Sequence, residues 1–234
     1  MNFFDTIIYQ PLFNVLILFY QNFGRDLGVA TIMLAAFIKL ATYPLMADSV
    51  RTQATLRRLQ PKIDEINEKY KNDKEKKNLL QFGLLQENKI NIFSGFLLII
   101  VQIAIIPPLY RIFKDGFAVE KLNEVLYGFV SHQEVSAMFL GLFDISTALP
   151  VFAIIAGVTQ FIQMKVMASI TPKPAAGQGG QLAQMMQSPV IYYVFPAMAV
   201  AFFWGLPAVI SLYWAAVSVF SVAEQYIILK KIKQ

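Results

Sequence analysis

The sequence contains no cysteine and one histidine, His132. Structural disulfides, thiolate metal sites, cysteine-linked lipid anchors and histidine-cluster metal sites are therefore excluded. Charge is also scarce, because Asp, Glu, Lys and Arg make up 15% of the 234 residues, whereas about 25% is usual in soluble domains. We expect no metal and no cofactor, and the composition argues against a soluble protein.

Residue patterns suited to catalysis or nucleotide binding are missing as well. The glycines of 177–180 follow Pro172 and Pro174 and not a strand, which predicts a flexible loop and no phosphate-binding site. No Ser/His/Asp set can be assembled, and no internal repeat supports an inverted-repeat transporter. We predict no catalytic residues and a protein that is not an enzyme.

Apolar residues dominate the chain, at 56% of the sequence. A transmembrane helix needs about 20 predominantly apolar residues to cross about 30 Å of hydrocarbon. Five runs meet this requirement, at residues 27–47, 92–113, 147–168, 190–206 and 208–229. The predicted fold class is an all-α integral membrane protein with five transmembrane helices.

The charges are segregated between these runs. Ten of the 20 Lys and Arg residues lie in residues 51–91, and Lys230, Lys231 and Lys233 lie in the C-terminal tail, whereas residues 114–146 carry five acids and two lysines. The positive-inside rule places the basic segments in the cytoplasm. We therefore expect the N-terminus outside and the C-terminus inside, and no nucleic-acid substrate despite the net charge of +5.

Residues 1–24 are apolar but interrupted by Asp5, Gln10, Pro11 and Asn14. A basic n-region and a small-residue cleavage site are both missing, which argues against a secretory signal. An amphipathic helix lying on the outer leaflet fits this pattern best. A sixth span is the alternative.

The polar segment 51–91 predicts a cytoplasmic helical hairpin. A heptad stripe marks its first helix, Asn72-Asp73 predicts the turn, and a less regular apolar face follows. The stripe is Leu56, Leu59, Ile63, Ile66 and Tyr70, and the second face is Leu79, Leu80, Phe82, Leu84 and Leu85. We expect Pro61 to kink or restart the first helix. A solvated hairpin without a partner is the alternative to a docking arm.

Lys39 lies in the middle of the first predicted span, where a lysine costs about 2.5–3.5 kcal/mol. A hydrated cavity open to the cytoplasm would offset this cost, and snorkelling to the interface is the alternative. Further polar residues within the spans could line the same cavity, although each is more often a helix–helix hydrogen bond. They are Gln102, Thr159, Gln160, Gln163, Ser218, Ser221, Glu224 and Gln225.

The fourth run is short for a span. Its 17 residues, 190–206, cover only about 25 Å, less than the hydrocarbon core of about 30 Å. Pro189 precedes the run, and Gly205-Leu206-Pro207 predicts a tight turn after it. Local thinning of the bilayer would follow, unless the helix begins earlier, near Met185.

Four strings and Leu59-Gln60-Pro61, taken in order, carry a family resemblance. The strings are IKLATYPLM at 38–46, QIAIIPPLYRIF at 102–113, AGVTQFIQMK at 156–165 and GLPAVISLYWAAVSVFSVAEQ at 205–225. Their order and spacing resemble the YidC/Oxa family of membrane protein insertases across essentially the whole chain, in its short bacterial form with five spans.

The resemblance implies an insertase and chaperone of the bacterial plasma membrane. Such a protein moves hydrophobic segments of nascent proteins from the cytoplasm into the bilayer through a polar groove open to cytoplasm and lipid. Nascent membrane proteins and lipid would be its partners. The ribosome, the signal-recognition receptor and the Sec translocon are candidate partners of the hairpin and basic tail. A small transporter or channel and a membrane scaffold remain the alternatives.

The resemblance also implies which residues line the substrate groove. They are Lys39, Gln102, Gln160, Gln163, Trp214, Ser218 and Glu224. Lys39 stands where the family has a groove arginine, and lysine lacks the guanidinium fork. Glu224 stands where the family usually has an uncharged polar residue, and Trp214 matches an aromatic groove position. Because a lone buried charge costs several kcal/mol, we predict that Lys39 and Glu224 form a pair or share a water network.

Overall fold

The computed structural model describes residues 5–88, 90, 100, 105, 107–108, 110–113, 125–130, 135–169 and 189–232. These residues form helices and one short two-stranded ribbon. Three of the described helices are long and apolar enough to cross a membrane, and a fourth apolar helix is shorter. Most of the span predicted at 92–113 lies outside the described residues.

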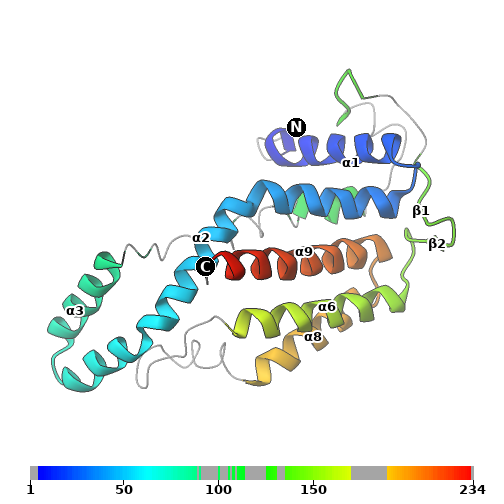
Figure 1. Ribbon diagram of the computed structural model, residues 1–234. Helices are drawn as coiled ribbons and strands as arrows, with labels where there is room; N and C mark the ends of the chain where they lie inside the picture. The colour runs from blue at the N-terminus through cyan, green and yellow to red at the C-terminus, as the bar shows by residue number, and fades with distance from the viewer. Residues whose placement is uncertain are drawn as a thin grey trace.

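The three long helices run side by side in the same direction (Figure 1). They are α2 (Leu27–Lys69), α6 (Pro150–Ala168) and α9 (Ala208–Ile232). Helix α9 contacts both α2 and α6, while α8 (Pro189–Phe203) runs the opposite way and packs mainly on α6. Helix α9 is therefore the centre of the bundle, and half of its apolar stretch is buried inside the protein.

Helix α2 is continuous over 43 residues, through Pro44 and Pro61. The carboxylate of Asp26 caps its first turn by accepting a hydrogen bond from the Val29 N–H, 2.9 Å long, and so satisfies a donor that has no partner within the helix. Figure 1 shows α2 changing direction on its way out of the bundle, and proline is the usual cause of such bends. The predicted span at 27–47 and the first hairpin helix are thus one helix, and Pro61 does not end it.

Helix α3 (Lys74–Glu87) follows α2 after a short turn at residues 70–73. Asp73 accepts a hydrogen bond from the Lys76 N–H, 3.0 Å long, and so caps α3. The Gln81 side chain donates to Asn67 Oδ1 across the hairpin at 2.8 Å. The predicted second apolar face is not wholly turned inward, because Leu79 and Phe82 are 70% and 59% exposed.

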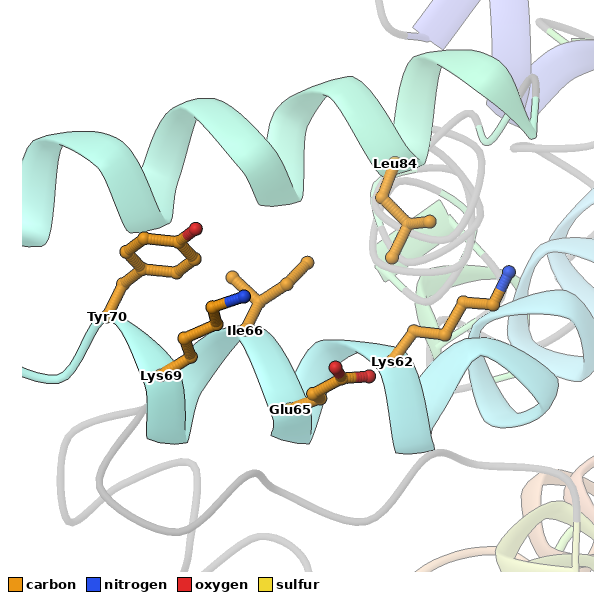
Figure 2. Close-up of a pocket in the computed structure, with 6 residues that line it drawn as sticks. All are labelled: Lys62, Glu65, Ile66, Lys69, Tyr70 and Leu84. Carbon is orange, nitrogen blue, oxygen red and sulfur yellow. The ribbon is translucent and has the colours of Figure 1, made fainter.

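A shallow concavity of about 270 Å³ lies between the two arms of this hairpin. Figure 2 shows the six residues that line it, five from the α2 arm and one from α3: Lys62, Glu65, Ile66, Lys69, Tyr70 and Leu84. The Tyr70 ring is flanked by two ammonium groups, with Lys76 Nζ 5.1 Å and Lys69 Nζ 5.8 Å from its centroid. The lining is therefore mixed, with two lysines, one glutamate, one tyrosine and two aliphatic side chains.

Residues 5–22 form a π-helical turn, η1 (Asp5–Tyr9), followed by α1 (Gln10–Asn22). The apolar side of this segment belongs to the main core and packs on α2. Its buried side chains are Tyr9, Phe13, Leu16, Ile17 and Tyr20. Gly24, with φ +78°, makes the tight connection to α2, a backbone conformation that glycine adopts without steric cost.

Asn14 fixes α1 to the segment 125–130 although it lies in an otherwise apolar helix. Its side chain is buried, donates to the Val125 carbonyl at 2.9 Å and accepts from the Tyr127 N–H at 2.7 Å. The Gln10 amide also donates to Val125, at 3.1 Å. Side chains of α1 therefore satisfy backbone groups of a segment more than 100 residues away.

The ribbon of β1 (Met138–Phe139) and β2 (Phe143–Asp144) lies at the end of the bundle where α2, α6 and α9 begin (Figure 1). The Phe139 ring packs so closely on Gly28 that a Cβ there would overlap it. The carbonyls of Ile145 and Thr147 accept hydrogen bonds from the first N–H groups of α9, at 3.0 and 2.8 Å. This segment ties the starting ends of the helices together.

Helix α8 has 15 residues and ends at Phe203, three residues before the predicted end of the fourth span. The Leu206 N–H donates to the Phe203 carbonyl at 3.2 Å, which closes the turn into α9. The alternative helix start near Met185 lies outside the described residues. Likewise, α6 begins at Pro150, three residues after the predicted start of the third span.

Candidate functional site

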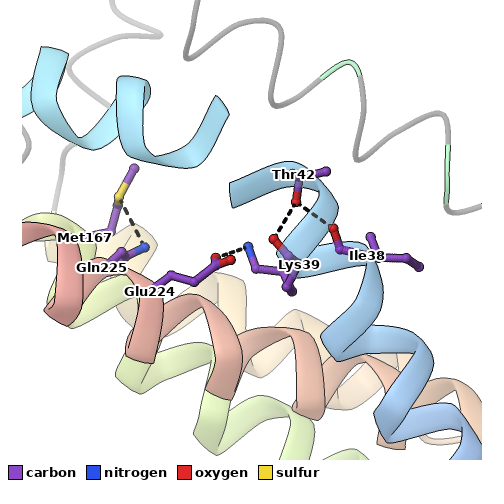
Figure 3. A network of polar contacts seen from close by, with 6 residues as sticks. All are labelled: Ile38, Lys39, Thr42, Met167, Glu224 and Gln225. Carbon is purple, nitrogen blue, oxygen red and sulfur yellow. Dashed lines mark hydrogen bonds and ion pairs between the residues drawn. The ribbon is translucent and has the colours of Figure 1, made fainter. Parts of the chain in front are cut away.

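An ion pair joins α2 to α9 through Lys39, the residue whose charge was predicted to lie within the first span. Lys39 Nζ lies 2.7 Å from Glu224 Oε2, and the two side chains are 12% and 11% exposed. Figure 3 shows both side chains reaching across the space between the helices. The predicted pairing of these residues is confirmed. The Lys39 ammonium meets an opposite charge between the helices without snorkelling to the membrane interface.

Hydrogen bonds within α2 itself also stabilise the turn that contains Lys39. The Thr42 hydroxyl lies within hydrogen-bond distance of two main-chain carbonyls one turn earlier, those of Ile38 at 2.9 Å and Lys39 at 3.3 Å. A threonine bonded in this way satisfies its own polar group without a second helix. The pair itself is the main polar link between α2 and α9 among the described residues, and removing one partner of such a buried pair costs about 3–5 kcal/mol.

A second polar group joins α6 to α9. Gln160 is 9% exposed, and its Oε1 accepts hydrogen bonds from Trp214 Nε1 at 2.8 Å and from Ser218 Oγ at 3.3 Å. The Trp214 ring also meets the Phe203 ring, with 5.5 Å between centroids. Three residues predicted to line one groove are therefore in direct contact.

The two polar groups lie on different faces of α9. At about 100° per residue, Trp214, Ser218 and Gln225 share one face, and Glu224 points roughly 80–120° away from them. The first face meets α6, since Gln225 Nε2 lies 3.7 Å from Met167 Sδ, whereas Glu224 meets α2. The structure thus separates the predicted groove residues into an α6 group and an α2 pair.

Two further residues, Gln163 and Gln102, were predicted to line the groove. Gln163 is partly buried on α6, one turn after Gln160. Gln102 lies outside the described residues. The Met167 contact and the Asn14 anchor were not predicted, and for Asn14 the available signal was a polar residue inside an apolar run.

No group of three or more His, Asp or Glu side chains converges within the described part of the chain. Two carboxylates have separate roles: Glu224 pairs with Lys39, and Asp26 caps α2. The described site residues act through an ion pair and through hydrogen bonds.

Comparison with known proteins identifies the family. The model of the 60Kd inner membrane protein family matches residues 18–234. The membrane protein insertase YidC of Syntrophobacter fumaroxidans is 34% identical over 223 residues, which are 94% of this chain and 37% of that protein. The YidC of Methylobacillus flagellatus is 33% identical over 225 residues, 95% of this chain and 36% of that protein.

A shorter relative is covered almost in full. The membrane protein insertase YidC of Fusobacterium nucleatum is 28% identical over 211 residues, which are 90% of each chain. The chain therefore spans a little more than a third of the first two relatives and nine-tenths of the third. With the family match covering all the described helices from α2 onward, the chain belongs to the 60Kd inner membrane protein family, the family of the YidC membrane protein insertases.

Proposed function

We propose that the protein is a membrane protein insertase that moves hydrophobic segments of nascent proteins from the cytoplasm into the bilayer. The family match over residues 18–234 carries this proposal. The polar contacts between apolar helices are consistent with it, because they place a charged pair and an amide group where a passing polar segment could exchange hydrogen bonds.

The proposed pathway is a polar groove lined by Lys39, Gln102, Gln160, Gln163, Trp214, Ser218 and Glu224. A polar segment that crosses lipid loses the water bound to its backbone, which is costly. A hydrated groove that reaches partway across would shorten this apolar barrier. The hydrophobic part of the substrate would then move sideways into lipid, which is favourable by about 0.3–0.6 kcal/mol for each Leu, Ile, Phe or Val.

The proposed topology has five spans, with the N-terminus outside and the C-terminus in the cytoplasm. The distribution of Lys and Arg supports this orientation. We place η1 and α1 on the outer surface, because α1 bonds to Val125 and Tyr127 and because Asp5 pairs with Arg111 at 2.8 Å. The hairpin of α2 and α3 then lies in the cytoplasm, where its many lysine and arginine side chains could meet the ribosome, the signal-recognition receptor or the Sec translocon.

Reconstitution tests the proposed function. Proteoliposomes that contain only this protein should integrate a small single-span substrate, so that its translocated end becomes protected from external protease. Liposomes without protein provide the control. A small transporter or channel, or a membrane scaffold, would leave the substrate unprotected, and that result would contradict the proposal.

A further inference from the structure

The Lys39–Glu224 pair brings a carboxylate of the protein itself to the cation of the proposed groove. The 2.7 Å separation is a full ion-pair contact, and the two side chains are almost equally buried. An acidic residue of a substrate would form the same kind of contact with Lys39. The position that such a residue needs is therefore already occupied by Glu224.

The other oxygen of Glu224 shows how this carboxylate is held. Oε1 is buried and has no hydrogen-bond partner among the described residues. Neighbouring polar side chains on α9 face elsewhere, since Gln225 contacts Met167 and Ser218 contacts Gln160. Within the described part of the chain, Lys39 is the one cation that binds Glu224, so an incoming carboxylate has a single contact to replace.

We propose that Glu224 acts as an internal counter-ion that sets the charge preference of the groove. The inference rests on the proposed insertase function. Because the paired site carries no net charge, it neither strongly attracts acidic translocated segments nor strongly repels basic ones. The site therefore suits substrates whose translocated segments are neutral or of either sign, and an acidic segment enters by displacing Glu224 from Lys39.

Two opposite substitutions test this assignment. Glu224→Gln keeps the shape of the side chain and leaves Lys39 as a free cation, so insertion of an acidic segment should rise relative to a basic one. Lys39→Gln leaves Glu224 as a free anion, so the ratio should shift the other way. Like charges that face each other across a binding site disfavour the wrong partner, and we expect changes on the order of five- to tenfold in the ratio.

The substrates are three single-span proteins that differ at one position of the translocated segment, with Asp, Asn or Lys. Insertion is measured by protease protection in proteoliposomes without an ion gradient, so that no membrane potential favours either sign. Glu75→Gln is the matched control, because Glu75 is an exposed carboxylate on α3 and its removal changes the net charge equally. This control should leave the Asp/Lys insertion ratio unchanged.

The outcomes separate the inference from the function on which it rests. Opposite shifts of the Asp/Lys ratio in the two variants would support the counter-ion role. Normal insertion with an unchanged ratio in either variant would overturn it and leave the insertase function intact. If the unaltered protein inserted none of the three substrates, the proposed function would fail. If Glu224→Gln did not fold, the ratio in Lys39→Gln would decide the question alone.

Discussion

Gly157 allows α6 and α8 to approach closely, and replacing it with alanine should weaken their contact. A Cβ at this position would overlap Cγ2 of Val200 and lie 3.2 Å from the Pro196 carbonyl oxygen. Carbon atoms in favourable contact are about 3.5–4.0 Å apart. Val200 cannot easily turn away because its β-branched side chain is stiff, and the Pro196 carbonyl is part of the backbone.

The expected cost of Gly157→Ala follows from overpacking, which destabilises by about 1–3 kcal/mol. Alanine also favours the helix over glycine by up to about 1 kcal/mol, which partly hides this cost. The substitution Gly83→Ala on α3 measures this gain in helix propensity alone, since a Cβ there would meet nothing within 4 Å. The difference in unfolding free energy between Gly157→Ala and Gly83→Ala should therefore be about 1–3 kcal/mol.

Unfolding in mixed micelles by titration with sodium dodecyl sulfate gives this difference. The two tryptophans report on the region of interest, because Trp214 contacts Phe203 at the end of α8 and Gln160 on α6. Adding Val200→Ala removes the overlapping methyl group, so the double variant should be more stable than the sum of the single changes predicts. A difference below about 0.5 kcal/mol, or strict additivity with Val200→Ala, would refute the close α6–α8 contact.

Four further outcomes are expected. Lys39→Ala should impair insertion of substrates with acidic translocated segments in the protease-protection assay while Lys39→Arg retains it, and normal insertion by Lys39→Ala would contradict the electrostatic role. Asn14→Ala should lower the unfolding free energy by about 1–3 kcal/mol because buried backbone groups lose partners, whereas Asn22→Ala, an exposed change, should stay within about 0.5 kcal/mol. Hydrogen exchange should be fast over residues 55–88 because few buried contacts hold the hairpin, and uniformly slow exchange without a partner would be inconsistent with this. If α8 makes up the whole fourth span, its 15 residues cover about 22 Å; lipid-thickness measurements should then show a dip beside residues 189–203, and a flat bilayer there would exclude thinning.

The sequence was most informative where a single residue would have a large free-energy cost in its position without a partner. A lysine in an apolar run needs a partner, and Glu224 was the only acid in the fifth predicted span. That reasoning found the ion pair, although nothing in the sequence shows that α2 and α9 touch. Asn72-Asp73 likewise marked the turn between α2 and α3, because short polar residues favour turns and helix caps.

Other features depend on contacts that sequence patterns do not contain. Pro61 predicted a kink or a restart of the first hairpin helix, and the helix does not restart there, because it continues to Lys69. Proline removes one hydrogen bond and can bend a helix without ending it. Asn14 looked like an interruption of an apolar run and is instead bonded to a segment more than 100 residues away. Helical periodicity alone separates Glu224 from Trp214 and Ser218, but only the contacts of α9 with α2 and α6 show which helix each face meets.

The continuity of α2 connects the hairpin to the Lys39–Glu224 ion pair through a single helix. The same helix carries Lys39 and the first arm of the hairpin, and the 30 residues from Lys39 to Lys69 extend over about 45 Å. If α2 moved as one body with its bend kept, a rotation of about 5° at the ion pair would move the far end of the helix by up to about 4 Å. We therefore expect a load on the hairpin to reach the Lys39–Glu224 contact through α2, and separation of that pair to move the hairpin. Because the chain has no cysteine, a label placed on α3 through one introduced cysteine would report this swing without background.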